Sequence, residues 1–430
     1  MIKSVYVCLV SDHNIVELEA CLLHKPSDLV LVVTEKMAEA AARLKKVIEK
    51  KLPETRVHIT KSTAKYPLKG EEVENAFKWV SKVLKPALKS LKAEKYGLNM
   101  TGGTKILALA VAQARQWDWI DYKGWGNEKL ESFALNNTQQ VKKHTPPVID
   151  VISAVALYAN ECVQSKESPW SHLDAAARAV LAQEIWDALE GETTASDQGL
   201  SYLFELFAQA WYPKTQDRIE IDPAKADFDG SRFNDWIEKF QKLLPNSLRR
   251  EGHALHFGAE KRQKNWRQWI GGGWLEELAY AWLKNAGLPE EQMALNLRDN
   301  ADSAQSREVD LAAVHRGTLM IIEAKADKDS KTQAKSFEEQ ISSIGERYGR
   351  STKLLFLGPE AQRSIKAKGK NKNAWTDFEK RCKGSHVSVI TSRAALLKAA
   401  KLGDFVADVG GTKREGAPQA VGQDTEIRVQ

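Results

Sequence analysis

A lysine and several carboxylates in the C-terminal half of the chain occur at a spacing that suits phosphodiester chemistry. In "REVDLAAVHRGTLMIIEAKAD", the dipeptide Arg316-Gly317 separates two apolar runs, which predicts a two-residue hairpin loop because glycine readily adopts positive φ. Counting outward from this loop in antiparallel register places Asp310 opposite Glu323. The register gathers four charged side chains at one end of the hairpin: Glu308, Asp310, Glu323 and Lys325.

Regular alternation along the two strands would put these four charges on one face. That face also carries Ala312 and Val314, and the other carries Val309 and Leu311, so the hairpin is expected inside a covered sheet. Buried carboxylates that lie close together need neutralising, and Mg²⁺ or Mn²⁺ would do this. Such a metal activates water for phosphodiester hydrolysis, while Lys325 would hold the water or the scissile phosphate. The alternative is a surface hairpin with an ordinary cross-strand ion pair.

A third carboxylate is expected from the helix that opens with "GGGWLEELAYAWL". Helical spacing predicts a core stripe made of Leu275, Leu278, Ala279 and Trp282. Glu276 falls beside this stripe, whereas Glu277 is expected to point toward Lys284 and solvent. The predicted catalytic residues are therefore Glu276, Asp310, Glu323 and Lys325, and the predicted metal ligands are Asp310, Glu323 and Glu276.

A second polar cluster, "TGGTK" at 101–105, stands between a predicted strand and an apolar helix. The first turn of a helix presents unpaired N–H groups and a partial positive charge, so anions bind there. Two glycines would let a phosphate approach the backbone, two threonines offer hydroxyls and Lys105 adds a full charge. The spacing is not that of a Walker loop, and the alternative is a plain tight turn. "GGTK" recurs at 410–413 without a following helix, so no site is assigned there.

Strands alternate with helices over the first 145 residues, which predicts an α/β domain with a mainly parallel sheet. Ligands bind at the carboxyl ends of such strands. Three polar segments follow strands there: "SDHN" at 11–14, "TEK" at 34–36 and the 101–105 loop. We therefore expect an anion site built from Ser11, Asp12, His13, Asn14, Thr34, Glu35, Asn99, Thr101, Gly102, Gly103, Thr104 and Lys105. His13 would either contact the ligand or cap a turn.

The 430 residues are too many for one ordinary core, so several domains are expected. Residues 146–261 show a mainly helical pattern and are interpreted as a connecting region, 262–409 as a second α/β domain, and 410–430 as a disordered tail. The net charge of +6 permits a nucleic-acid partner without demanding one, and basic segments with tryptophans at 261–269 and 365–375 would suit a phosphate track.

Neither a membrane span nor a cleavable leader is evident, so a cytoplasmic location is expected. Four scattered cysteines without a Cys-x-x-Cys pair indicate no zinc site or disulfide framework.

The two clusters together resemble a known family. "NMTGGTK" after a strand in an N-terminal α/β domain is similar to the signature of CARF domains, the Rossmann-like sensors of cyclic oligoadenylates. "GGWLEE…EVD…EAK" resembles the PD-(D/E)xK core of restriction-endonuclease-like domains, although Val309 stands where the family pattern has proline. In this order, the motifs resemble the CRISPR ancillary nucleases of type III systems.

The resemblance implies a homodimer in which two sensor domains bind one cyclic oligoadenylate, most often cyclic tetra-adenylate, and thereby activate cleavage of single-stranded or nicked DNA or RNA. Two other classes of function stay open. One is a ligand-gated protein that binds nucleic acid without cutting it. The other is a restriction-type nuclease whose activity ignores any nucleotide.

Overall fold

The computed structural model describes residues 2–63, 65–68, 72–124, 127–134, 137–158, 162–164, 174–190, 195–211, 218–222, 230–243, 248–257, 268–299, 308–326, 348, 351–367 and 373–402. The predicted disordered tail, the second "GGTK" and most of the basic segment at 261–269 lie outside these residues, as does 368–372 of the other basic segment.

The N-terminal domain is an α/β domain with a seven-stranded sheet in the order β3-β2-β1-β4-β5-β6-β7. Its parallel strands are β1 (Ser4–Leu9), β2 (Asp28–Val33), β3 (Arg56–Lys61), β4 (Lys95–Asn99) and β5 (Trp119–Tyr122). Two antiparallel strands complete it, β6 (Leu130–Ala134) and β7 (Asn137–His144). The predicted parallel α/β arrangement is confirmed.

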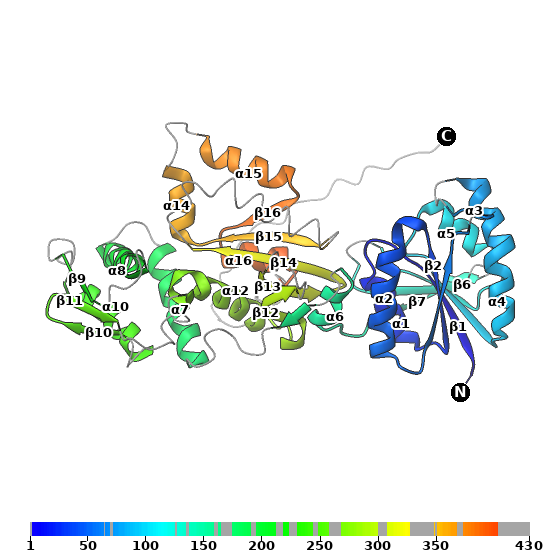
Figure 1. The fold of residues 1–430 in the computed structure, drawn as a ribbon, viewed down its shortest axis with the longest axis horizontal. Coiled ribbons are helices and arrows are strands. Elements are labelled where there is room, and N and C mark those ends of the chain that lie inside the picture. The colour runs from blue at the N-terminus through cyan, green and yellow to red at the C-terminus, as the bar shows by residue number, and fades with distance from the viewer. Residues whose placement is uncertain are drawn as a thin grey trace, which may run out of the picture.

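Helices cover both faces of this sheet, which explains why its central strands are apolar throughout. Tyr6 and Cys8 of β1 pack in one core cluster with α1 (Ile15–His24) and α2 (Ala38–Lys51). Val5 and Val7 pack in another, with α3 (Val73–Trp79), α4 (Lys85–Leu91) and α5 (Lys105–Ala112). Figure 1 shows the two helical layers on either side of the sheet.

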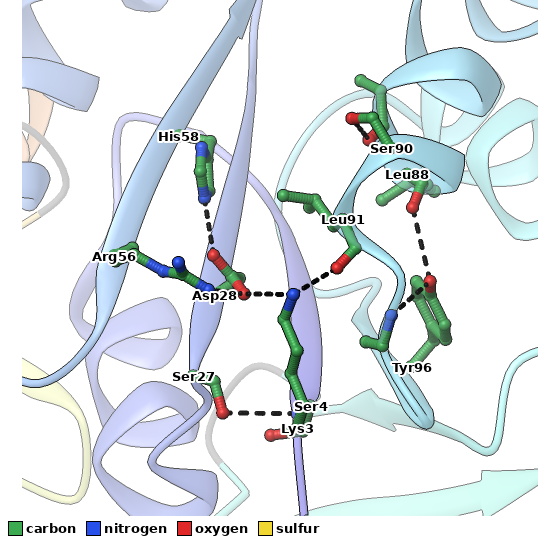
Figure 2. A network of polar contacts seen from close by, with 12 residues as sticks. Lys3, Ser4, Ser27, Asp28, Arg56, His58, Leu88, Ser90, Leu91 and Tyr96 are labelled. Carbon is green, nitrogen blue, oxygen red and sulfur yellow. Dashed lines mark hydrogen bonds and ion pairs between the residues drawn. The ribbon is translucent and has the colours of Figure 1, made fainter.

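A polar network closes the amino ends of the central strands (Figure 2). The Asp28 carboxylate is fully buried and accepts hydrogen bonds from Arg56 at 2.7 Å and His58 at 2.8 Å. Burial alone would raise the pKa of Asp28, but the bonds from His58 and Arg56 outweigh it and hold that pKa below its ordinary value. Lys3, which precedes β1, forms a 4.0 Å ion pair with Asp28 and also donates a hydrogen bond to the Leu91 carbonyl. The polar groups at this end of the sheet are therefore paired with one another. The predicted anion-binding loops lie at the opposite end, where the parallel strands end.

Strand β1 lies between β2 on one side and β4 on the other, so the strand order reverses at β1. A crevice therefore opens between the carboxyl ends of β1 and β4, where ligands bind in open α/β sheets.

The C-terminal part has a six-stranded sheet in the order β16-β15-β14-β13-β12-β8. Its strands are β12 (Met293–Asp299), β13 (Glu308–His315), β14 (Thr318–Lys325), β15 (Thr352–Leu357), β16 (Val387–Ile390) and β8 (Cys162–Gln164). Strands β14, β15 and β16 are parallel, and the others pair antiparallel. One face packs against α7 (Ala175–Glu190), α12 (Trp274–Asn285) and α16 (Arg393–Ala399). Near β15, the other face packs against α14 (Pro359–Ala367) and α15 (Ala374–Gly384).

The region 146–261, predicted to be mainly helical, contains strands as well. The helices α6 (Val151–Ala156), α8 (Ala195–Trp211) and α10 (Gly230–Leu243) are accompanied by a small sheet of β9 (Arg218–Glu220), β10 (Leu248–Glu251) and β11 (Ala254–Phe257). Strand β8 joins the C-terminal sheet, and α7 packs on α12. These strands have only three or four residues, too short for a periodic pattern to reveal.

Helix α6 lies between the N-terminal domain and the C-terminal sheet (Figure 1). One continuous core cluster includes α1, α2, α6 and the side chains of Ala312, Val314, Leu319 and Ile321 from the β13–β14 hairpin. Lys51 of α2 forms a 2.6 Å ion pair with Asp150, the N-cap of α6. The two sheets are thus joined by packed side chains, so a displacement in one domain can reach the other. Among the described residues, no helix is both long and apolar enough to cross a membrane.

Candidate functional site

The β13–β14 hairpin has the predicted turn and, as far as Leu311, the predicted register. The ladder runs from His315–Thr318 to Leu311–Ile322, and Arg316 and Gly317 occupy the turn with φ of 50° and 75°. Both central residues have positive φ, as a type I′ turn requires. Beyond Leu311 the ladder ends, and the Asp310 carboxylate instead accepts a hydrogen bond from the Ala324 N–H at 2.9 Å.

Side chains do not alternate regularly between the two faces at this end of β13, so the predicted assignment of residues to faces was wrong here. Val309 and Leu311 were expected on the same face, but Leu311 packs in the cluster beneath α12 and Val309 packs in the opposite cluster with Ala312 and Val314. The neighbouring strand β12 contains Asn296 with φ of 53°, a left-handed conformation that regular strands lack. The local twist at Asn296 therefore turns the charged end of the hairpin away from the alternating pattern.

Lys325 lies among the predicted catalytic carboxylates. Its Nζ atom lies 2.5 Å from Glu323 Oε1 and 3.8 Å from Asp310 Oδ2. The side chain of Glu323 is 2% exposed and that of Asp310 16%. Glu308 pairs with Arg298 of β12 at 2.9 Å, so the ordinary Glu308–Lys325 pair of a surface hairpin is not what the structure contains.

Glu276 joins this group from the first turn of α12. Burial raises its pKa well above the ordinary value, and the nearby Asp310 carboxylate raises it further. With its amide oriented to suit its neighbours, Asn296 donates to Glu276 Oε2 at 3.3 Å and to Glu308 Oε1 at 3.0 Å. Asn296 thus links the helix to the strand end, which sequence reasoning did not foresee.

Glu277 does not point to solvent, contrary to the sequence-based expectation. Its carboxylate accepts hydrogen bonds from Arg178 Nε at 2.9 and 3.0 Å and from Trp269 Nε1 at 2.7 Å. Arg178 lies on α7, about a hundred residues earlier in the chain, so local periodicity could not reveal the pair. The choice of Glu276 over Glu277 for the charged cluster agrees with the structure.

If all three were ionised, the carboxylates Glu276, Asp310 and Glu323 would carry more negative charge than one lysine can balance, so the neutral forms are favoured. Burial, followed by the Asp310 charge, raises the pKa of Glu323 to about 7, and burial also raises the pKa of Asp310. Burial would lower the pKa of Lys325, but Asp310 and Glu323 outweigh it and raise that pKa. Acidic oxygens in excess are a donor set that suits a hard divalent cation. As the side chains stand, no three acidic, histidine or cysteine groups of the described residues are close enough to hold a metal.

The second site is a pocket of about 270 Å³ at the carboxyl ends of β1, β4 and β5. Six of the predicted anion-site residues line it: Ser11, Asp12, His13, Thr101, Gly102 and Gly103. Sequence reasoning missed its other lining residues: Val16, Glu17, Tyr122, Lys123, Gly124, Asn127, Arg316, Gly317 and Thr318. The "YKG" at 122–124, where the β5 strand ends, was an available signal for three of these residues.

The other six predicted residues lie outside the pocket lining. Thr34 and Glu35 follow β2, which lies on the far side of β1 from the crevice. The remaining four build the loops: Asn14 accepts from the Ser11 N–H at 3.1 Å, Asn99 accepts from the Thr101 N–H at 2.9 Å, Thr104 caps α5, and Lys105 is exposed at its first turn.

Glycine at 102 is required by packing rather than by room for a ligand. A Cβ there would lie 2.0 Å from the Leu9 carbonyl oxygen and 2.3 Å from Glu17 Oε1. The loop therefore lies directly against the end of β1. Thr101 anchors its other side, since its Oγ1 accepts a hydrogen bond from the Lys123 N–H at 3.0 Å.

One buried acid, Glu17, lines this pocket, and a second, Glu19, is paired with the lining residue Lys123. Glu17 is fully buried, and among the described residues neither of its carboxyl oxygens has a partner in another residue. Burial raises the pKa of Glu17 to about 8, so this group is mostly neutral at pH 7. Glu19 is paired with the Lys123 ammonium at 2.6 Å, with both side chains at most 5% exposed. A neutral Glu17 does not repel an anionic ligand and can donate a hydrogen bond to it.

A comparison with known protein families gives a match for the N-terminal domain. Residues 5–151 match the family model described as the Card1 CARF domain. This N-terminal domain therefore resembles a CRISPR-associated CARF domain. No protein in the curated set matches the chain.

Two solved structures resemble almost the entire chain. The protein VC1899 from Vibrio cholerae is 15% identical with a TM-score of 0.65, covering 94% of this chain and 98% of its own. Can2 from Sulfobacillus thermosulfidooxidans, solved with cyclic tetra-adenylate, is 19% identical with a TM-score of 0.62, covering 94% and 97%. At these identities the likeness shows a shared fold that extends beyond the CARF-like domain.

Proposed function

We propose that this protein is a metal-dependent nuclease of type III CRISPR defence, activated by a cyclic oligoadenylate. The observation that carries the proposal is the hairpin β13–β14. Its turn lines the pocket of the CARF-like domain, and its other end carries Asp310, Glu323 and Lys325. A sensor pocket and a buried acid cluster thus share one structural element.

Glu276, Asp310 and Glu323 would hold Mg²⁺ or Mn²⁺. When bound, the cation would activate water and stabilise charge on the phosphate under attack. Lys325, whose pKa is raised by the two acids beside it, stays protonated and orients the scissile phosphate. The surrounding apolar face excludes bulk water, which strengthens these electrostatic interactions.

Cyclic tetra-adenylate is the proposed activator. The family match over residues 5–151 supports an oligoadenylate, and the cyclic tetra-adenylate in the Can2 structure supports this ring size. A two-fold ligand suits a homodimer, in which each copy contributes an equivalent pocket. The substrates would be single-stranded or nicked DNA or RNA, cut in the cytoplasm.

Cleavage assays on labelled single-stranded RNA, single-stranded DNA and supercoiled plasmid would test this. Each substrate is incubated with Mg²⁺ or Mn²⁺, with and without cyclic tetra-adenylate, beside Glu323→Ala. We expect cutting that requires both metal and ligand, and a loss of at least about 10²-fold in the variant. Undiminished cutting by Glu323→Ala would remove the acid cluster from the active site. Cutting indifferent to ligand would favour a restriction-type enzyme, and binding without cutting would favour a gated nucleic-acid-binding protein.

A further inference from the structure

The pocket of the CARF-like domain is not built by that domain alone. Arg316, Gly317 and Thr318, at the tip of the β13–β14 hairpin, form part of its lining together with Ser11–His13 and Thr101–Gly103. These three residues lie almost two hundred positions after the last N-terminal strand that contributes to the pocket. A ligand in the pocket would therefore contact the C-terminal domain directly.

Two contacts hold the hairpin tip against the pocket. The His13 ring donates through Nε2 to the Gly317 carbonyl at 3.2 Å and accepts at Nδ1 from the Tyr158 hydroxyl at 2.7 Å, which assigns its tautomer. The backbone of Gly317 lies on the buried Lys123–Glu19 pair, since a Cβ at Gly317 would be 2.8 Å from Lys123 Nζ. The tip is thus seated on the same lysine whose N–H anchors Thr101.

The charges in the pocket single out Arg316. Among the residues described as lining it, the cations are Lys123 and Arg316, and the ammonium of Lys123 is already committed to Glu19. Arg316 forms a 2.8 Å ion pair with Glu128, whose side chain is 57% exposed and does not line the pocket. An ion pair with an exposed partner contributes little, whereas a phosphate accepts strong charge-assisted hydrogen bonds from a guanidinium. An anionic ligand can therefore displace Glu128.

We propose that Arg316 binds a phosphodiester group of the ligand and exchanges Glu128 for it, so that ligand binding acts directly on the strands that carry Asp310 and Glu323. This inference rests on the proposed function, because it takes a cyclic oligoadenylate as the occupant of the pocket. Strands β13 and β14 are continuous from the tip to Asp310 and Lys325, and they carry the coupling between the two sites.

Calorimetric titration of the full-length protein with cyclic tetra-adenylate tests the binding half. Arg316→Gln should weaken affinity about tenfold, and Glu128→Gln should tighten it a few-fold by removing the competitor. The double variant should behave like Arg316→Gln, because Glu128 acts only through this arginine. Arg298→Gln is the matched control, since Arg298 is ion-paired with Glu308 in the same sheet but lies outside the pocket lining.

Equal affinity of the wild type and Arg316→Gln would overturn the inference while leaving the proposed function intact. Absence of binding by the wild type would overturn both. The cleavage rate at saturating ligand tests the second part of the inference, the coupling between the two sites. Arg316→Gln should reduce the stimulation of cleavage by the ligand even though the pocket is filled. Full stimulation in the saturated variant would overturn the coupling half, because Arg316 would then bind the ligand without transmitting its effect.

Discussion

The pocket and the acid cluster are two charged sites built in opposite ways. The pocket is assembled from loops at strand ends, and Arg316, one of the two cations described in its lining, comes from the C-terminal domain. The cluster stands on two strands and a helix, with Glu323 and Asp310 almost enclosed. Loops can rearrange around a ligand at small cost, whereas rigid elements hold reacting groups in place. The difference fits an adaptable sensing site joined to a preorganised chemical site.

The two sites also differ in the balance of acidic and basic groups. In the pocket, Lys123 and Glu19 neutralise each other one to one. In the cluster, one lysine, Lys325, faces three acids, Glu276, Asp310 and Glu323, and the pKa of each acid is raised. A buried pair of one acid and one base is balanced without further partners, whereas the proposed metal would allow all three acids of the cluster to ionise. The two buried lysines therefore offer a direct contrast.

Replacing each lysine by methionine tests this difference and is expected to give the largest change in the free energy of unfolding. Lys123→Met leaves Glu19 buried without its partner and should lower the free energy of unfolding by about 3–5 kcal/mol, whatever the metal concentration. Lys325→Met should recover part of its loss when Mg²⁺ is added, because the cation takes the place of the ammonium. Denaturant unfolding of both variants with and without Mg²⁺ measures this. An equal metal response in the two variants would contradict the contrast.

Glu17→Gln should change the free energy of unfolding by an amount that depends on pH. The pKa of Glu17 is raised to about 8, so its neutral form stabilises the fold below its ordinary pKa of 4.5, and this contribution is lost as pH rises toward 8. Glutamine stays neutral, so the variant should gain stability relative to the wild type as pH rises between these values, by at most about 1.4 kcal/mol for each pH step of one. Melting temperatures from pH 5 to 9 measure the difference. A constant difference would mean that Glu17 does not titrate in this range.

Lys105→Ala should have the smallest effect, and it separates local pattern from three-dimensional placement. The 101–105 motif alone predicts a substantial loss of ligand affinity in this variant. In the structure Lys105 is exposed and outside the pocket lining, so we expect a change of no more than a few-fold in the affinity for cyclic tetra-adenylate. A loss as large as that expected for Arg316→Gln would return Lys105 to the site.

Local signals were sufficient for the hairpin. The Arg316-Gly317 turn and the adjoining apolar runs predicted two paired strands with the register that the structure shows as far as Leu311, because a two-residue turn determines the register on either side of it. The parallel N-terminal sheet followed from the alternation of strands with helices. Periodicity placed Glu276 in the charged cluster, but it was wrong to place Glu277 toward solvent.

Contacts between distant parts of the chain could not be predicted in this way. The partner of Glu277 is Arg178 on α7, and the tip of the hairpin reaches the pocket where the hairpin packs with α1, α2 and α6 in one core cluster. The twist at Asn296 depends on a backbone conformation that residue type does not specify. Each of these features arises from packing in three dimensions, where spacing along the chain carries no information.

The most direct test of the account compares two titrations of the wild-type protein with cyclic tetra-adenylate. One follows ligand binding, and the other follows the cleavage rate in the presence of Mn²⁺. If the pocket controls the acid cluster, the two curves rise together with the same midpoint. A cleavage rate that stays constant while the pocket fills would contradict the central claim that one hairpin joins sensing to chemistry.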